Sequence, residues 1–471
     1  MDYRELLAQA HVSALDYCTG LGDRKVAATA STADLLRALG GAFPEHGQGP
    51  TRVLTELIAG VEPGLVHSAG PRYFGFVIGG SLPVAVAADW MTSAWDQNAF
   101  GYVLSPAASV VEQVTSRWLL DALHLPASAS VGFVTGGQLA NFTCLCAARD
   151  AVLSRAGVDV ARDGLADAHL TVFVGEQGHS TIYTALRLLG IGQKQVVTVA
   201  VDAQGRLSAA SLREALAKHD GPAIVCAQAG NVSTGAFDPF VEIVEATRAR
   251  GAWLHVDGAF GLWAAAVPAL RGLLEGVEGA DSWAVDAHKW LNVPYDSGLA
   301  IVADASAHQR AMGTNPAAYL VREAGEHDGS DWAPESSRRA RAFAIYAVLR
   351  CLGRDGLADL IARGCSLART MAARLTHDAG AIILNDVVLN QVLARFTRRG
   401  SADHSAADIA DGDAVTSAVI ERVQREGVCW VGPSRYMGRV VMRVSVSNWS
   451  TTERDIALSV ASIARAATAR D

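Results

Sequence analysis

The feature that most constrains the fold is a series of short apolar segments that alternate with helical patterns between residues 66 and 350. The segments lie at residues 131–135, 170–175, 195–201, 222–228, 252–257, 282–287 and 298–303. Near-continuous apolar strands of this length, mostly separated by helices, are typical of a mostly parallel sheet covered by helices on both faces. We therefore predict an α/β fold with a mostly parallel, seven-stranded sheet.

Two smaller regions flank this core. Residues 1–65 have the pattern of amphipathic helices, with a loop at residues 43–51. After residue 350, a helix at 356–376, strands at 390–396 and 439–448 and a C-terminal helix predict a small α+β domain, and the polar stretch 398–413 predicts a surface loop. The expected division is 1–65, 66–350 and 351–471.

Charge and targeting signals limit the partners and the location. The net charge is −8, and the longest basic run is the short "TRRG" at residues 397–400, which argues against nucleic acid or an anionic membrane as a partner. No basic segment followed by an apolar one opens the chain, and the apolar windows are too short to cross a bilayer. We expect a cytoplasmic protein.

The seven cysteines are scattered and never form a C-x-x-C pair. Cys144 and Cys146 are two residues apart in a predicted helix, so they point to different faces and cannot hold one metal ion together. We expect reduced thiols in apolar packing and no metal site.

In sheets of this kind ligands bind beyond the carboxyl ends of the strands, so the residues there are the first candidates for chemistry. Gly136, Gly137 and Gln138 follow the segment at 131–135 and open a helix. Glycines let backbone N–H groups approach an anion, and the helix N-terminus adds its dipole, so this turn suits a phosphate. It matches neither the P-loop nor the dinucleotide G-x-G-x-x-G pattern.

Two further strand ends carry an imidazole and a carboxylate. His179 follows the segment at 170–175, where it is either a helix cap, a satisfied core group or a functional residue. Asp257 ends the segment at 252–257, next to the sheet. A buried carboxylate is costly unless a cation or hydrogen bonds compensate it, so we expect a positive partner.

Lys289 lies in the apolar stretch "DSWAVDAHKWLNVPYDSG". Loss of water disfavours a charged amine and leaves a neutral nucleophile, which would make this lysine reactive. The alternative is a structural ion pair with Asp286 or Asp296. Taken together, a phosphate cradle, an imidazole, a buried acid and an activated amine are what pyridoxal phosphate requires of a protein.

The motifs that carry these residues resemble one family. The strings "NAFGYVLSPAASVVEQ", "TGGQLANF", "GHSTIYTA", "GAFDP", "HVDGAFG", "DAHKWLNVPYDSG" and "SSRRARAF" are similar to group II pyridoxal-phosphate-dependent decarboxylases, which act on aromatic amino acids, histidine or glutamate. The resemblance runs from about residue 70 to about residue 456 and implies fold type I. It also implies decarboxylation of an L-amino acid to the amine and CO₂.

The resemblance assigns cofactor roles by position. Lys289 would be the Schiff-base lysine and Asp257 the partner of the pyridinium nitrogen. His179 would stack on one face of the ring and Ala259 would pack on the other. The phosphate would be bound by Gly137 and Gln138, together with Asp286 or His288.

The resemblance also assigns a substrate pocket, whose candidates are Phe76, Val77, Ile78, Asn98, Phe100 and Tyr102. Their character favours an aromatic or apolar amino acid, although the context of Asn98 and Phe100 is similar to that of the glutamate enzymes. In the family these two positions reach the pocket from the other subunit, which implies a homodimer. Arg443 resembles an arginine near the substrate carboxylate, and its alternative role is a salt bridge in the C-terminal domain.

Two departures leave the reaction open. Many members carry a proton-donating loop tyrosine that has no counterpart in residues 320–339, where His327 is either a substitute or a solvated loop histidine. Val232 stands where the family has a threonine near the cofactor. The alternatives to amine formation are oxidative decarboxylation to an aldehyde, or an aminotransfer in which His288 and Lys289 move protons. The intact lysine, acid and histidine argue against a non-catalytic binding subunit.

Overall fold

The computed structural model describes residues 2–165, 168–313, 325–398 and 405–469. The chain forms two compact units. Unit 1 comprises Met1–Ile78, Thr370–Leu384 and Leu393–Asp471, and unit 2 comprises Gly79–Arg369 and Asn385–Val392. Unit 1 gathers segments from both ends of the chain, so its boundaries differ from the expected three-part division, which stays a prediction.

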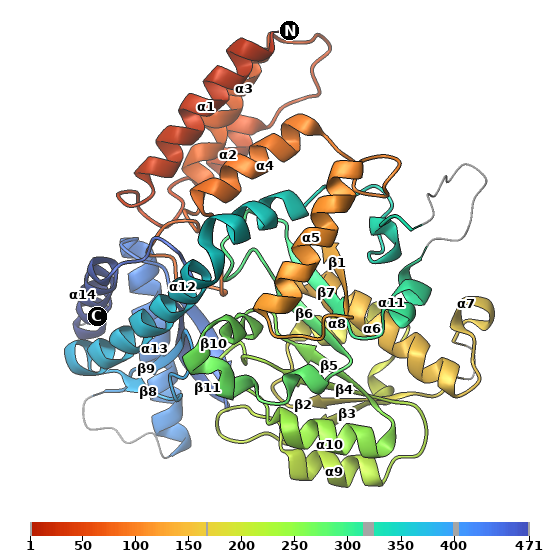
Figure 1. Cartoon of the computed structure of the whole chain (residues 1–471). Helices are drawn as coiled ribbons and strands as arrows, with labels where there is room; N and C mark the ends of the chain where they lie inside the picture. Colours follow the sequence, from red (N-terminus) through yellow and green to blue (C-terminus); the bar gives the residue numbers. More distant parts are fainter. Residues whose placement is uncertain (1, 166–167, 314–324, 399–404, 470–471) are drawn as a thin grey trace. The chain divides into compact units, whose positions relative to one another are not determined.

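Unit 2 contains the predicted seven-stranded sheet, which is confirmed (Figure 1). Its strands are β1 (Ser130–Val134), β2 (Thr171–Gly175), β3 (Val196–Val199), β4 (Ala223–Gln228), β5 (Trp253–Asp257), β6 (Ser282–Asp286) and β7 (Gly298–Val302). The strand order is β1-β7-β6-β5-β4-β2-β3. In the part of the sheet ordered β6-β5-β4-β2-β3, each strand is parallel to its neighbours. Strand β7 is antiparallel to both β1 and β6.

The reversal at β7 follows from the length of its connection. Residues 287–297 join β6 to β7 by a turn. A parallel crossover needs a dozen or more residues and usually a helix, so this segment returns the chain in the opposite direction. The turn carries Lys289 and places it at the carboxyl end of β6.

Helices cover both faces of the sheet (Figure 1). Those of unit 2 are α4 (Pro83–Trp95), α5 (Pro106–Ala122), α6 (Gly137–Arg155), α7 (Val160–Asp163), α8 (Ser180–Leu188), α9 (Ala209–Ala217), α10 (Phe240–Arg250) and α11 (Ala305–Met312). α6 packs with α8 and α11 and buries Cys144, Leu145 and Ala148 in the main core. α12 (Ala342–Ala379) changes direction at Gly353, whose φ is 60°.

Short 3-10 helices complete the irregular connections. They lie at Glu62–Gly64, Gln193–Gln195, Gly261–Ala266, Pro268–Leu274, Val277–Gly279 and Gly329–Asp331.

Unit 1 contains the N-terminal helices and the C-terminal α+β elements. They are α1 (Tyr3–Gly20), α2 (Thr32–Leu39), α3 (Pro50–Val61), β8 (Ile382–Ile383), β9 (Gln391–Arg395), which begins in unit 2, α13 (Ala406–Glu426), β10 (Gly432–Tyr436), β11 (Arg439–Ser445) and α14 (Glu453–Thr468). The loop predicted at 398–413 is wrong for its second half, because Ser405 and Asp408 form a capping box that starts α13. Residues 399–404 lie outside the described residues.

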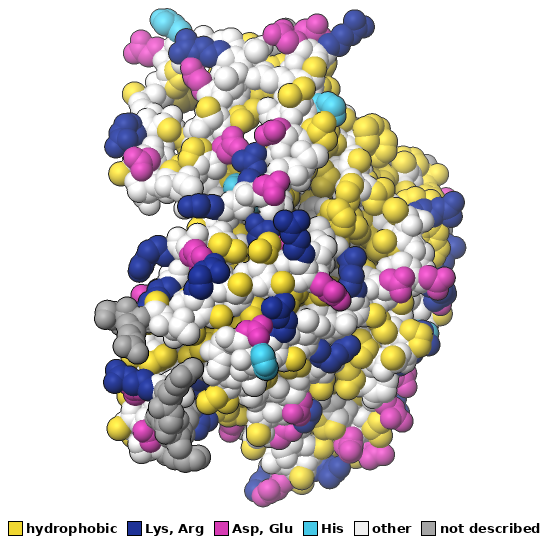
Figure 2. All heavy atoms as spheres, turned by 90° about the vertical axis from the view of Figure 1, so that its left-hand side faces the viewer, with side chains coloured by type: hydrophobic (Ala, Val, Ile, Leu, Met, Phe, Trp, Pro, Cys, Tyr) yellow, Lys and Arg dark blue, Asp and Glu magenta, His cyan; other side chains and the backbone are white. Residues whose placement is uncertain are grey.

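The cysteine prediction needs one correction. All seven are free, and five are buried, but Cys18 and Cys351 are exposed. Among the described helices, none is long and apolar enough to cross a bilayer. Figure 2 shows acidic and basic side chains interspersed on the face that it presents.

Candidate active site

One pocket of unit 2 gathers most of the predicted cofactor residues. Its lining includes Gly137, Gln138, His179, Asp257, Ala259, Asp286 and Lys289. They come from the first turn of α6, the start of α8 and the ends of β5 and β6. The carboxyl edge of the sheet therefore brings together a glycine turn, an imidazole, two carboxylates and an amine, as the strand-end argument predicts.

The turn that carries Lys289 is held by the segment that opens unit 2. Gly80 N donates to Asn292 Oδ1 over 2.8 Å, and Leu82 N donates to the Asn292 carbonyl over 2.9 Å. A Cβ on Gly79 would lie 1.8 Å from the Lys289 carbonyl oxygen, so the close approach requires glycine. The backbone of Lys289 is thus fixed by contacts far away in sequence.

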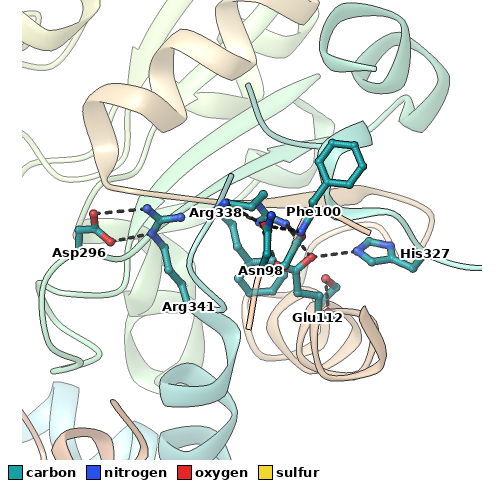
Figure 3. A network of polar contacts seen from close by, with 10 residues as sticks. Asn98, Phe100, Glu112, Asp296, His327, Arg338 and Arg341 are labelled. Carbon is teal, nitrogen blue, oxygen red and sulfur yellow. Dashed lines mark hydrogen bonds and ion pairs between the residues drawn. The ribbon is translucent and has the colours of Figure 1, made fainter. Parts of the chain in front are cut away.

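The Lys289 amine pairs with Asp286. Nζ lies 2.7 Å from Asp286 Oδ2, and the Asp286 side chain is only 2% exposed. Asp296, the other proposed partner, instead pairs with Arg341, whose Nε lies 2.7 Å from its Oδ1 (Figure 3). The ion-pair alternative is therefore observed, with Asp286 as the partner, and it keeps a proton acceptor beside the amine.

Asp286 also caps α6. Gly136 has no side chain to accept from the first-turn amides, and the Gly137 N–H donates to Asp286 Oδ1 instead. A carboxylate has acceptors alone, so an ionised Asp286 has no donor for a phosphate. His288 is the other candidate, and its Nδ1 lies 2.7 Å from the Ser297 carbonyl oxygen, to which it donates. Burial lowers the pKa of His288, against the opposing effect of Asp286.

Two hydrogen bonds within the chain partly compensate the buried charge of Asp257, and its expected positive partner stays a prediction. Asn141 Nδ2 donates to its Oδ2 over 3.2 Å, and Ala259 N donates to its Oδ1 over 3.2 Å. Among the described residues no cation forms a salt bridge with it. Asp257 is 6% exposed and lines the pocket, so a cationic group bound there would complete the compensation of its charge.

His179 is both a helix cap and a pocket residue. Its Nδ1 accepts from Thr181 N over 3.3 Å and lies 2.8 Å from Thr181 Oγ1. As the N-cap of α8 the ring is fixed in orientation. The cap reading and the functional reading are therefore compatible.

Sequence reasoning missed part of the lining. The additional residues are Asn141, Thr181, Gln228, Gly230 and Phe260, and Val232 lies among them. Gln228 ends β4, so the strand-end rule could have found it. Asn141 lies about one helical turn after Gln138, on the same side of α6.

Comparisons with known proteins agree with this geometry. Residues 33–397 match the family described as pyridoxal-dependent decarboxylase conserved domain. The chain belongs to this family. Tryptophan decarboxylase 1 of Oryza sativa subsp. japonica is 31% identical over 417 residues, which cover 84% of this chain and 80% of that protein. Phenylacetaldehyde synthase of Arabidopsis thaliana is 26% identical, over 97% and 94% of the two chains.

A solved structure extends the similarity to the fold. The crystal structure of Oryza sativa TDC with PLP and tryptamine has a TM-score of 0.91 and 28% identity, and covers 99% of this chain and 98% of that one. The protein is thus a pyridoxal-phosphate-dependent carboxy-lyase of fold type I. The donor set fits the cofactor, since an amine, a carboxylate, an imidazole and a glycine turn at a helix N-terminus line one pocket.

In this decarboxylase, Asn98 and Phe100 do not line the pocket formed by the described residues. The Asn98 Oδ1 accepts from Phe100 N and from Arg338 N, each over 3.1 Å (Figure 3). Arg338 in turn contacts the buried Glu112 at 2.9 Å. This loop is therefore rigidly tied within its own chain, while its contact with substrate stays a prediction.

His327 belongs to the same network, which corrects its interpretation as a solvated loop histidine. Its Nε2 lies 3.1 Å from Glu112 Oε2, and its ring is parallel to Trp332, with 6.2 Å between the centroids. Residues 320–324 of the predicted loop lie outside the described residues. Within the part that is described, His327 is anchored.

Three further substrate candidates, Phe76, Val77 and Arg443, lie in unit 1. Phe76 and Val77 both have left-handed backbone, with φ of 55° and 57°, and Phe76 stacks on Trp430 with centroids 5.5 Å apart. Phe76 is 62% exposed, whereas Val77 is buried. Arg443 lies on β11, and burial lowers the pKa of its guanidinium. Their roles toward a substrate stay predictions.

Proposed function

We propose that this enzyme decarboxylates an aromatic L-amino acid and releases the amine and CO₂. The observation that carries the proposal is the single pocket in which Lys289, Asp257 and His179 meet. Its similarity to a plant tryptophan decarboxylase supports the aromatic class. The aromatic side chain of Phe260 in the lining is consistent with that choice.

We assign the following roles to the residues of the pocket. Lys289 holds the cofactor aldehyde, and Asp257 holds a proton on the ring nitrogen. His179 and Ala259 pack on the two faces of the ring. Gln138 binds the phosphate with its backbone N–H, and Gly137 lies beside the phosphate with its own N–H donated to Asp286. His288 is the better of the two further candidates, because an ionised Asp286 has no donor.

Bound pyridoxal phosphate supplies an electron sink for the pair that CO₂ leaves behind. Asp257 makes that sink effective, because a carboxylate fixed by Asn141 and Ala259 stabilises positive charge at the ring nitrogen without reorganising. Asp286 sits 2.7 Å from the Lys289 amine and can accept the proton that the amine must lose before it attacks. The buried surroundings strengthen both effects.

A second outcome is favoured by the two departures from the family. Residues 320–339 contain no tyrosine and Val232 stands in place of a threonine, so protonation at Cα has no assigned donor. O₂ would then act as the oxidant, and the amino acid with water would give an aldehyde, CO₂ and ammonia while O₂ is reduced to hydrogen peroxide. The similarity to a phenylacetaldehyde synthase supports this alternative.

We further propose a cytoplasmic homodimer in which residues 1–65 pack on the partner subunit, residues 66–350 bind the cofactor and residues 351–471 form the small domain. α1 contains no buried residue, and Leu7, Val12 and Leu15 are 60%, 66% and 53% exposed. An uncovered apolar helix face is typical of an interaction surface. Light scattering of wild type and of Leu7→Glu/Val12→Glu tests the dimer, which the double variant should weaken.

A product assay tests the reaction. Holoenzyme is incubated with aromatic, apolar and acidic amino acids, in air and without oxygen, and CO₂, amine, aldehyde and peroxide are measured. We expect amine and CO₂ in equal amounts from an aromatic substrate, and none from the Lys289→Ala variant. Aldehyde with peroxide, lost without oxygen, would support the alternative, and turnover of acidic substrates alone would contradict the proposed class.

A further inference from the structure

The buried amide of Asn141 joins residues on three different elements. Its Nδ2 donates to Thr181 Oγ1 over 3.0 Å and to Asp257 Oδ2 over 3.2 Å. Its Oδ1 lies 2.9 Å from His255 Nε2. Asn141 is 1% exposed and lies on α6, so it is held in the core between β5 and the start of α8.

The direction of each hydrogen bond is fixed by the chemistry of the partners. Asp257 carries acceptors alone, so the amide nitrogen of Asn141 must face it and the amide oxygen must face His255. His255 then donates from Nε2. Burial lowers the pKa of His255 to about 4, so the ring is neutral near pH 7 and its Nδ1 accepts from Ser282 Oγ at 3.0 Å.

On one side, the series of hydrogen bonds that starts at Asp257 ends at a group that can only donate. Trp253 Nε1 donates to Ser282 Oγ over 2.9 Å, and because His255 Nδ1 carries no proton, the serine hydroxyl points its own hydrogen at His255. The tryptophan N–H cannot accept, and every link between it and Asp257 therefore has one allowed orientation.

On the other side the same amide reaches His179 through Thr181. Because Thr181 Oγ1 accepts from Asn141, its hydroxyl hydrogen is available for His179 Nδ1, 2.8 Å away. Thr181 N also donates to Nδ1, so this nitrogen carries no proton. The neutral imidazole accordingly carries its hydrogen on Nε2.

We propose that Asn141 is a positioning residue that orients Asp257 and His179 together, and that His255 fixes the direction of its amide. The proposal rests on the roles of Asp257 and His179 in the proposed function. One amide thereby sets both the partner of the ring nitrogen and the tautomer of the stacking imidazole. Asn141 needs no contact with the reacting atoms for this.

The first test replaces Asn141 by leucine, which keeps the volume and removes the amide. Asp257 would keep only the Ala259 N–H. Because a hydrogen bond to a charged group contributes more than a neutral one, we expect pyridoxal phosphate to bind about tenfold or more weakly. We also expect the pH dependence of its visible absorbance to shift, because the ring nitrogen loses a fixed partner. Asn385→Leu removes another buried asparagine of unit 2, which donates to the Thr234 and Gln391 carbonyls, and should leave both readouts unchanged.

The second test concerns the direction of the amide. His255→Gln retains an N–H donor for Asn141 and should keep cofactor affinity within about threefold of wild type, whereas His255→Leu should behave like Asn141→Leu. Equal effects of the two His255 variants, or an unchanged spectrum and affinity in Asn141→Leu, would overturn the proposal.

Lys289→Ala separates this proposal from the proposed function. If Lys289→Ala loses the visible band of wild type while Asn141→Leu matches wild type, the positioning role alone fails. If Lys289→Ala retains that band unchanged, the assigned role of the lysine fails instead, and the inference that depends on the proposed function fails with it.

Discussion

Replacing Arg338 with methionine should destabilise the enzyme by about 3–5 kcal/mol, the usual cost of leaving one member of a buried ion pair alone. The Arg338 side chain is fully buried and Glu112 is 2% exposed. Arg338 also donates to the Ala99 carbonyl over 2.6 Å and to the Phe133 carbonyl over 2.9 Å. Methionine fills similar space but satisfies none of these acceptors.

The pH dependence has a defined sign. Ion pairing with Arg338 and contact with His327 hold the pKa of Glu112 below its usual value, although burial acts in the opposite direction. The wild-type contribution is therefore present above the ordinary glutamate pKa and is lost as the pH falls. Without Arg338, burial favours the protonated acid, so the deficit of Arg338→Met should shrink toward acidic pH.

The assay is urea unfolding of holoenzyme, followed by tryptophan fluorescence and by circular dichroism. Arg354→Met is the control, because Arg354 and its partner Asp121 are 65% and 60% exposed, and such a pair contributes about 0–1 kcal/mol. Adding Glu112→Leu to Arg338→Met should recover part of the loss, since the double variant leaves no lone charge. The reasoning is refuted if Arg338→Met costs no more than the control, or if the two changes are additive.

Three further predictions concern the site and the acid stability. Gly79→Ala places a Cβ 1.8 Å from the Lys289 carbonyl oxygen and should lower cofactor retention in gel filtration about tenfold or more, while Gly272→Ala, with open space around it, should not. Burial lowers the pKa of His308 to about 4 from an ordinary 6.5, so the unfolded state binds a proton first and the free energy of unfolding falls as the pH drops through this range. His308→Gln should reduce that fall in urea titrations, whereas the exposed His377→Gln should not. His327→Gln should leave the amine-to-aldehyde ratio unchanged if the anchored ring is structural; a rise in aldehyde would make it the proton donor.

The strands were predictable because their apolar runs depend on local sequence alone. The antiparallel direction of β7 could also be predicted, because the connection 287–297 is short for a parallel crossover. Ser405 and Asp408 carried a capping signal that the polar composition around them obscured. In each case the information was local.

The partners within the site were not predictable in this way. Asp286 caps α6 from 149 residues away, and Glu112 binds His327 across 215 residues. The sequence also did not reveal the two donors that Asp257 accepts from, a buried amide and a backbone N–H. Such contacts depend on how the elements pack, which a single sequence does not reveal, whereas the residue types themselves already indicated the chemistry.

The first turns of α6 have a consequence for the choice of cofactor. Gly137 begins the helix and Asn141 lies four residues later, about 6 Å along its axis at the usual rise per residue. If the first turn of α6 holds the phosphate while Asn141 orients the partner of the ring nitrogen, one rigid helix positions the groups that bind both ends of the same small molecule. The spacing along α6 would then select the cofactor by its length. An analogue whose phosphate arm is one atom longer or shorter would be rejected, whatever its ring chemistry.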